Sequence, residues 1–210
     1  MCCLGVIRID LASKLIVFEG LDASGKSTQA RRLAQCLEQR QVDVVSTREP
    51  GGTPVAESLR TVLLERKHQE LLPFSELLLF MVGRAQNTHQ VILPALHDGK
   101  TVIASRYRLS SLAYQGYGRG LDLELIRELN EAATSGTRAD VTFLIDVPEE
   151  YTMQRKAGRG DRIEIESIDF HRRVRQGFLK LVAGDPTVHV LDGTGSIDEI
   201  SAAVLHHLGL

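Results

Sequence analysis

The sequence predicts an α/β protein with a five-stranded parallel sheet and helices on both faces. Five short runs rich in Val, Ile and Leu mostly lack polar alternation, as expected of strands that are buried on both faces. Segments with helical periodicity separate these runs. Alternation of strands and helices produces parallel sheets with right-handed crossovers, which place helices over both faces of the sheet.

The predicted elements follow one another without a repeat, a low-complexity tract or a linker. The predicted strands span residues 15–19, 42–46, 101–104, 141–147 and 188–191. The predicted helices span residues 27–40, 54–65, 73–97, 121–133, 149–156, 167–183 and 197–208. We therefore expect a single domain over residues 14–210, preceded by an N-terminal tail over residues 1–13.

The composition narrows the class of protein. A formal net charge of −2 and a pI near 6.4 argue against a surface that binds nucleic acid. No apolar run approaches the roughly 20 residues that span a bilayer, and the first residues lack the apolar stretch of a secretion signal. The three cysteines form no disulfide or zinc pattern. We therefore expect a cytoplasmic protein with no nucleic-acid partner and no membrane partner.

The segment GLDASGKS, residues 20–27, follows the first predicted strand and opens the first predicted helix. It matches the pattern G-x-x-x-x-G-K-[ST] of a phosphate-binding P-loop in the strand–loop–helix context that the motif requires. The glycines allow backbone N–H groups to turn towards a phosphate. Lys26 supplies a positive charge to the phosphate oxygens, and the Ser27 hydroxyl is placed to bind Mg²⁺. The segment predicts binding of a nucleoside triphosphate.

Four cations lie within the eight residues 155–162, where two glycines interrupt a helical pattern. One interpretation is a solvated helix end, since cations favour helix C-termini. The other is a lid that closes over phosphates and brings arginine charge to a transition state. The P-loop elsewhere in the chain favours the lid.

Six segments, taken in their order and spacing, resemble those of thymidylate kinases. They are FEGLDASGKST, TREPGGTPVAESLR, LLLFMVGRAQ, SRYRLSSLAYQGYGRG, VTFLIDVPEE and DRIEIESIDF. The resemblance extends over residues 14–208 and implies a P-loop nucleoside monophosphate kinase fold with a short lid. It also implies transfer of the γ-phosphoryl group of ATP to dTMP with Mg²⁺, by a homodimer whose helices 73–97 and 27–40 are candidates for the interface. The P-loop holds no arginine, as in the bacterial type, whose catalytic arginines lie in the lid.

The resemblance also implies roles for individual residues. The residues expected to bind ATP are Gly20, Leu21, Asp22, Ala23, Ser24, Gly25, Lys26, Ser27 and Thr28. The residues expected to act in catalysis are Lys26, Arg106, Arg155 and Arg159. The residues expected to bind the substrate dTMP are Asp22, Arg48, Phe80, Arg84, Arg106, Ser110, Ser111 and Gln115. Within that set Asp22 would accept a hydrogen bond from the deoxyribose 3′-hydroxyl, and Arg48 and Arg106 would clamp the dTMP phosphate.

Ordinary structural roles compete with several of these assignments. Phe80 and Arg84 share one helix face, and spacing alone favours a core position for Phe80 over stacking on thymine. Ser110, Ser111 and Gln115 also suit turns and helix caps. Glu49 either steadies its neighbour Arg48 or the waters of a metal ion, or forms a purely structural ion pair.

The chain departs from the family pattern at the end of its third predicted strand. Ser105 stands where an aspartate is expected, and a serine hydroxyl brings no negative charge to a metal shell. The lid is also about two residues shorter than expected, which leaves the roles of Arg155 and Arg159 open. Three hypotheses follow: an active dTMP kinase, a degenerate nucleotide-binding relative with weak or no turnover, or a kinase for another small acceptor. The intact arginines favour the first.

Overall fold

The five strands form one parallel sheet in the order β2-β3-β1-β4-β5, which confirms the predicted architecture. The computed structural model describes residues 11–156 and 160–210, without the side chains of residues 153–156. The strands are β1 (Leu15–Glu19), β2 (Val44–Arg48), β3 (Thr101–Ser105), β4 (Val141–Asp146) and β5 (Val188–Asp192). β1 is central and pairs with β3 and β4. Because all strands run in one direction, the loops after β1, β2 and β3 meet at one edge of the sheet.

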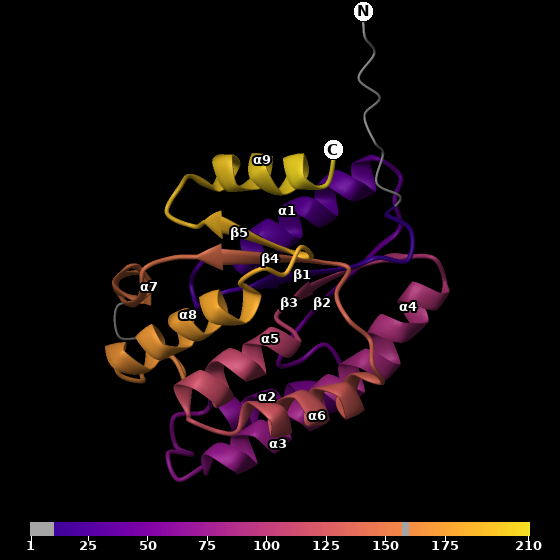
Figure 1. Cartoon of the computed structure of the whole chain (residues 1–210). Helices are drawn as coiled ribbons and strands as arrows, with labels where there is room; N and C mark the ends of the chain where they lie inside the picture. The colour runs from indigo at the N-terminus through magenta and orange to yellow at the C-terminus, as the bar shows by residue number, and fades with distance from the viewer. Residues whose placement is uncertain (1–10, 157–159) are drawn as a thin grey trace, which may run out of the picture.

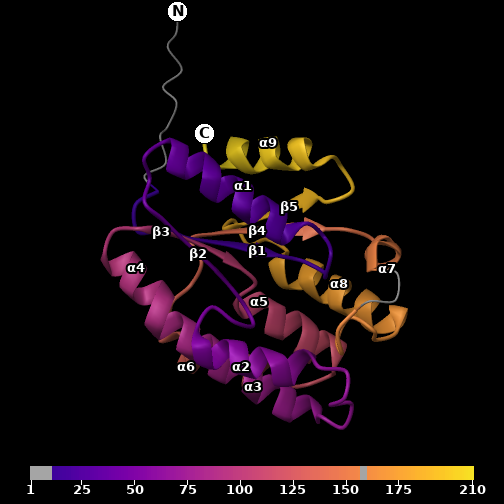
Figure 2. The same cartoon turned by 180° about the vertical axis from the view of Figure 1, so that it is seen from behind.

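Helices cover both faces of this sheet (Figures 1 and 2). One face carries α1 (Lys26–Gln39) and α9 (Ile197–His207), and a short α7 (Glu149–Lys156) follows β4. The other face carries α2 (Pro54–Leu64), α3 (Pro73–Asn87), α4 (Leu93–His97), α5 (Arg108–Ser111), α6 (Leu123–Thr134) and α8 (Ile168–Val182). Along β1 the side chains alternate between the two cores: Ile16 and Phe18 pack towards α1 and α9, whereas Leu15 and Val17 pack on the opposite side.

One helical segment was missed by the sequence analysis. α5 continues into a π-helical segment, η2 (Leu112–Gly118), and no helix was predicted over these residues. The glycines of η2 allow neighbouring helices to pack closely against it. A Cβ on Gly118 would lie 2.7 Å from the ring of Phe170 in α8, and one on Gly116 would lie 2.4 Å from Leu123. The predicted helix 73–97 is present as α3, a π-helical turn η1 (Thr88–Ile92) and α4.

The packed part of the chain begins before residue 14. Leu11 is buried in the core under α1 and α9, and its carbonyl accepts a hydrogen bond of 2.7 Å from the Thr101 hydroxyl. Residues 11–13 of the expected tail therefore lie against the body of the protein, and residues 1–10 lie outside the described part. Within the described residues no helix has the length and apolar character needed to cross a membrane.

Candidate active site at the carboxyl edge of the sheet

The predicted P-loop joins β1 to α1 with backbone angles that its glycines permit. Gly20 has a φ of 137° and Gly25, the N-cap of α1, a φ of 104°. A Cβ on Gly20 would lie 2.4 Å from the carbonyl oxygen of Ile145 in the neighbouring β4, so only glycine fits there. The loop therefore has the conformation that places the start of α1 at the edge of the sheet, where its positive dipole end favours phosphate.

Lys26 extends back across the P-loop. Its Nζ donates to the carbonyl oxygen of Leu21 at 2.5 Å and to Ser24 Oγ at 3.4 Å, while Ser27 is exposed. A cavity opens beside these residues, which we call the donor cavity. It is lined by Asp22, Ala23, Gly25, Lys26, Ser27, Thr28, Arg48, Glu49, Arg60, Ser105, Arg106 and Glu164. It lies where the P-loop motif predicts the triphosphate.

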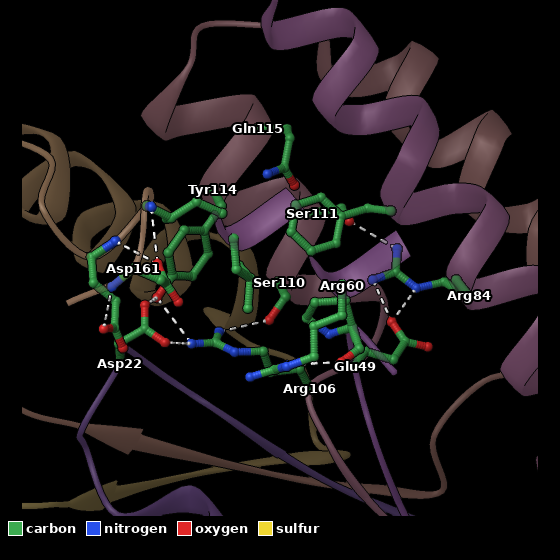
Figure 3. A pocket seen from close by; sticks show the side chains of 15 residues that line it. Asp22, Glu49, Arg60, Arg84, Arg106, Ser110, Ser111, Tyr114, Gln115 and Asp161 are labelled. Carbon is green, nitrogen blue, oxygen red and sulfur yellow. Dashed lines mark hydrogen bonds and ion pairs between the residues drawn. The ribbon is translucent and has the colours of Figure 1, made fainter. Parts of the chain in front are cut away.

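A second cavity, which we call the acceptor cavity, adjoins the first (Figure 3). It is lined by Asp22, Glu49, Pro50, Arg60, Leu64, Phe80, Arg84, Arg106, Ser110, Ser111, Tyr114, Gln115, Asp161, Ile163 and Glu164. Every residue that the sequence analysis assigned to dTMP binding lines this cavity except Arg48, which lines the donor cavity.

The two cavities share a wall. Five residues line both of them: Asp22, Glu49, Arg60, Arg106 and Glu164. They come from the P-loop, from the loop after β2, from α2, from the end of β3 and from the segment after α7. A group bound in one cavity therefore lies next to a group bound in the other, with positively and negatively charged side chains beside both.

Arg106 is the most densely bonded member of this wall. It adopts a positive φ of 72°, and its guanidinium pairs with the Asp22 carboxylate and donates to Ser110 Oγ at 3.1 Å. The Tyr114 hydroxyl donates to Asp22 Oδ2 at 2.9 Å and lies 3.2 Å from Arg106 Nη2. Burial works against the charged guanidinium, but the Asp22 carboxylate outweighs it and the pKa of Arg106 lies above its ordinary value. Arg106 is thus a permanent positive charge between the cavities.

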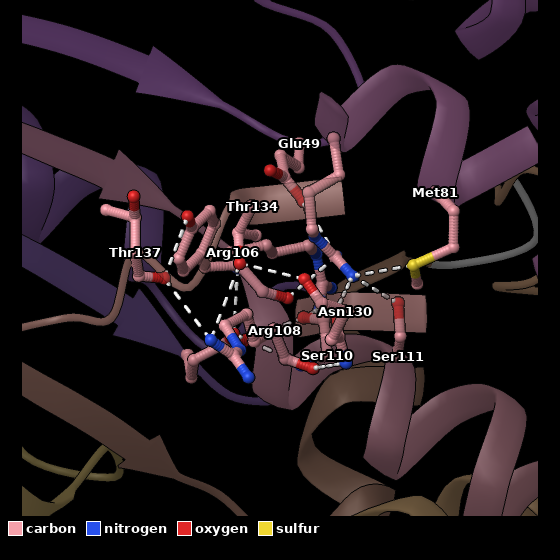
Figure 4. Close-up of polar contacts among 12 residues, drawn as sticks. Glu49, Met81, Arg106, Arg108, Ser110, Ser111, Asn130, Thr134 and Thr137 are labelled. Atoms are coloured by element: carbon pink, nitrogen blue, oxygen red, sulfur yellow. Dashed lines mark hydrogen bonds and ion pairs between the residues drawn. The ribbon is translucent and has the colours of Figure 1, made fainter. Parts of the chain in front are cut away.

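Arg84 is fully buried, and its guanidinium is surrounded by protein acceptors, of which Figure 4 labels Glu49, Ser111 and Asn130. Nε donates to Glu49 Oε2 at 2.8 Å, and Nη2 donates to the carbonyl oxygen of Tyr107 at 2.8 Å. Nη1 donates to Ser111 Oγ at 2.9 Å and to Asn130 Oδ1 at 2.6 Å. Arg84 lines the acceptor cavity, and its donors hold α3, α5 and α6 together.

Glu49 faces both cavities with one oxygen uncommitted. Its Oε2 pairs with Arg84, whereas Oε1 is buried and has no hydrogen-bond partner within the described part of the chain. Burial raises the pKa of this carboxyl, although the Arg84 charge opposes the rise. Glu49 thus forms a structural ion pair at Oε2, and its partner is Arg84 and not the neighbouring Arg48, which pairs with Glu57.

Two more arginines lie beside the donor cavity. Arg48 pairs with both carboxylate oxygens of Glu57 at 3.0 Å and is exposed. Arg60 donates to the carbonyl oxygen of Pro50 at 2.8 Å and lines both cavities. Burial, and then the charge of Arg48, lower the pKa of Arg60. An anion between these side chains would relieve the repulsion between the two guanidinium groups.

Two of the remaining predicted side chains are held by buried carboxylates, and the third packs against apolar residues. Ser110 donates to Glu19 Oε2 at 2.6 Å, and Gln115 donates to Glu76 Oε1 at 2.8 Å. Phe80 is half-buried, packs against the buried cluster that contains Ala113 and Tyr114, and lines the acceptor cavity. These three positions therefore combine the structural roles and the cavity positions that the sequence analysis left as alternatives.

The predicted lid is described only in part. Arg155 lies in the last turn of α7 and its side chain is not among those described, while Arg159 lies outside the described residues. The segment that follows is anchored to α2: the Arg162 backbone N–H donates to the carbonyl of Leu64 at 3.0 Å, and its Nε donates to the carbonyl of Leu63 at 2.9 Å. Asp161 and Glu164 from this segment line the acceptor cavity.

Ser105 ends β3 inside the donor cavity. It is buried, and its carbonyl accepts from the Glu49 backbone N–H at 2.9 Å. The position where the family pattern has an aspartate is thus beside Glu49, whose Oε1 is the buried oxygen without a partner. A carboxylate is present within this part of the site, although it comes from the loop after the neighbouring strand β2.

Several lining residues were missed by the sequence analysis. They are Arg60, Tyr114, Asp161 and Glu164. Arg60 had a signal, since it closes the quoted TREPGGTPVAESLR segment and a helix face carries it back to the sheet edge. Tyr114 also lay within a quoted segment, but its partner Asp22 is 92 residues away and only the fold joins them.

Comparisons with known proteins identify relatives over most of this chain. A family model described as thymidylate kinase matches residues 18–204. A thymidylate kinase from Kosmotoga olearia is 46% identical over 193 residues, covering 90% of this chain and 92% of the relative. One from Pelotomaculum thermopropionicum is 48% identical over 179 residues, covering 84% and 83%. The crystal structure of thymidylate kinase from Ehrlichia chaffeensis superposes with a TM-score of 0.79 at 36% identity, covering 95% of this chain and all of that one.

Proposed function

The chain belongs to the thymidylate kinase family of ATP-dependent nucleoside monophosphate kinases, and we propose that it joins ATP and dTMP across the shared wall of its two cavities. The γ-phosphoryl group of ATP passes to the phosphate of dTMP, giving dTDP and ADP. The observation that carries this proposal is that five charged residues line both cavities. A donor in one cavity and an acceptor in the other are thereby brought together, which is the main requirement of phosphoryl transfer.

The residues of the site divide into positioning and charge-neutralising groups. The P-loop backbone and Lys26 hold the triphosphate, while Arg60 and Arg106 hold the acceptor phosphate in line with it. Arg48, on the donor side, adds positive charge near the transferred group. Arg155 and Arg159 belong to the proposed lid, and arginines brought to such transition states accelerate transfer by roughly 10³ to 10⁵.

The base and sugar of dTMP occupy the deeper part of the acceptor cavity. Phe80 stacks on the pyrimidine ring, and Arg84, Ser111 and Gln115 surround its polar edge. Asp22 and Ser110 lie at the end of the cavity near the P-loop, where Asp22 accepts a hydrogen bond from the 3′-hydroxyl.

The donor cavity has oxygen ligands that fit Mg²⁺ bound with ATP. Ser27 exposes its hydroxyl there, and the buried Oε1 of Glu49 has no protein partner within the described residues. Hard oxygen donors of this kind are what Mg²⁺ prefers, together with phosphate oxygens and water. When bound, the ion supplies charge neutralisation on the phosphates. Glu49 thus provides a carboxylate near the position where Ser105 lacks one.

No observation supports the alternative of a degenerate binding protein. The P-loop, the two cavities and their arginines are all in place around Ser105.

We further propose a cytoplasmic homodimer. α3 exposes Phe74, Leu78 and Val82 at a spacing of one helical turn, beside exposed Val55 and Val62 of α2. The other candidate helix, α1, exposes mainly polar residues, so the α2–α3 face is the proposed interface.

A bisubstrate ligand tests whether the two cavities form one site. Adenosine and thymidine joined through five phosphates should bind at least about tenfold more tightly than ATP or dTMP, because linking two groups makes the second binding event intramolecular. Calorimetry measures the three affinities. An affinity no better than that of ATP alone would contradict the proposal that ATP and dTMP bind together across the shared wall.

A further inference from the structure

Glu76 is a buried carboxylate in α3 to which the proposed reaction gives no role. It is 1% exposed and lies where α3, η2 and the segment after α7 meet. Its Oε1 accepts from Gln115 Nε2 at 2.8 Å and from Arg119 Nε at 3.3 Å. Its Oε2 accepts from Arg119 Nη2 at 3.1 Å and lies 2.7 Å from Arg162 Nη2.

This arrangement fixes which end of the Gln115 amide faces Glu76. Two guanidinium groups balance the charge of the carboxylate, and a carboxylate only accepts hydrogen bonds. The atom of Gln115 that points to Glu76 must therefore be the donor Nε2. The acceptor Oε1 is left on the other side of the amide, and Gln115 lines the acceptor cavity (Figure 3).

An amide held in this way distinguishes pyrimidines by their N3 atom. Thymine and uracil carry a hydrogen on N3 and can donate it to Gln115 Oε1. Cytosine has a lone pair at N3, which would oppose the lone pairs of Oε1 and leave a buried acceptor unpaired. We infer that Glu76 is a positioning residue that sets selectivity for N3–H pyrimidines by holding Gln115 with its oxygen towards the base. This inference rests on the proposed binding of dTMP in the acceptor cavity.

The substitution Glu76→Gln tests the inference. A glutamine at this position can donate to Gln115 Oε1 and so allows the Gln115 amide to turn its Nε2 towards the base. The preference for dTMP over dCMP should fall at least about tenfold, because an orientation that excludes cytosine is no longer enforced. The preference is measured as a ratio of affinities by calorimetry and as a ratio of kcat/KM. Both ratios compare two ligands on one preparation, so a partly unfolded variant does not change them.

Glu166→Gln is the matched control. Glu166 pairs with Arg119 at 2.5 Å in the same cluster but has no hydrogen bond to Gln115, so its replacement should leave the ratio within about twofold of the original chain. In a Gln115→Leu background, Glu76→Gln should have no further effect on the ratio.

The inference is overturned if Glu76→Gln keeps the original ratio, or if Glu166→Gln lowers it equally. A chain that binds dTMP in preference to dCMP but transfers no phosphate would contradict the proposed function alone, since the affinity ratio does not depend on turnover. A chain that shows no preference between the two nucleotides would overturn the inference and leave phosphoryl transfer to be judged by ADP release.

Discussion

Asp22 in the P-loop and Arg106 at the end of β3 form an ion pair across the boundary between the donor and acceptor cavities. A carboxylate among phosphates would repel them, and Arg106 offsets that charge. Tyr114 donates to the second oxygen of Asp22 and places its ring 4.9 Å from the Arg106 guanidinium. The pair therefore fixes the orientation of the two residues that the proposed reaction assigns to the sugar and the phosphate of one nucleotide.

Asp22→Asn should weaken the use of dTMP by removing the charged acceptor of the 3′-hydroxyl. A hydrogen bond to a charged group contributes about 1.5–3 kcal/mol, so kcat/KM for dTMP should fall about 10- to 150-fold. The 3′-deoxy analogue of dTMP lacks the donor and is the control substrate. Steady-state kinetics with both acceptors should show the larger loss for dTMP, and an equal loss for both would exclude the sugar contact.

Replacing Arg84 should destabilise the fold as well as the site. Arg84→Leu leaves the Glu49 carboxylate buried without its partner, and breaking a buried pair in this way costs about 3–5 kcal/mol. Arg127→Leu, which breaks an exposed pair with Glu124, should cost less than about 1 kcal/mol. Urea unfolding of the three proteins gives the free energies. A loss below about 1 kcal/mol for Arg84→Leu would contradict the structural role of the pair.

Stability should depend on pH through Glu19. Burial raises the pKa of this carboxyl above its ordinary value of 4.5, although hydrogen bonds from Ser110 oppose the rise. The folded protein therefore binds this proton more tightly than the unfolded chain. The contribution to stability is complete below pH 4.5 and is lost as the pH rises through the folded pKa.

Glu19→Gln removes this group, so the free energy of unfolding of the variant should fall less steeply above pH 4.5 than that of the original chain. Glu131→Gln is a control of opposite sign, because Arg108 lowers the pKa of Glu131 and its contribution is lost as the pH falls. Urea unfolding across the acid range measures both differences. Parallel curves for Glu19→Gln and the original chain would show that Glu19 has the same pKa in both states.

The proposed interface predicts which helix face sets the mass of the protein in solution. Leu78→Glu combined with Val82→Glu places two charges on the exposed stripe of α3 and should convert a dimer to a monomer. Gln35→Glu on the exposed polar face of α1 should leave the mass unchanged. Light scattering after size-exclusion chromatography measures both. A dimer that persists with the α3 variant would place the interface elsewhere.

The strands and the P-loop could be predicted because their signals are local. β1 has the predicted bounds 15–19, and the loop after it has the conformation that its glycines require. α5 and η2 were missed because Gly116 and Gly118 are breakers in sequence, whereas here they admit side chains from α6 and α8. That reason depends on tertiary packing, which no local pattern contains.

The same limit applies to the site. Arg106 and Gln115 were predicted from motifs, but the carboxylates that orient them are distant in sequence: Asp22 is 84 residues from Arg106, and Glu76 is 39 residues from Gln115. The sequence around a buried acid in an apolar helix also does not indicate what that acid does. The fold is needed to show which charges meet.

Release of ADP shows directly whether a P-loop donor and a thymidylate acceptor meet across one charged wall. With ATP and Mg²⁺, we expect ADP release in the presence of dTMP but not of thymidine, which lacks the acceptor phosphate. Release should fall at least about 100-fold in Arg106→Ala, since an oriented charge at the reacting group contributes on that scale. If dTMP and ATP both bind but no ADP is released, the proposed meeting of donor and acceptor is contradicted.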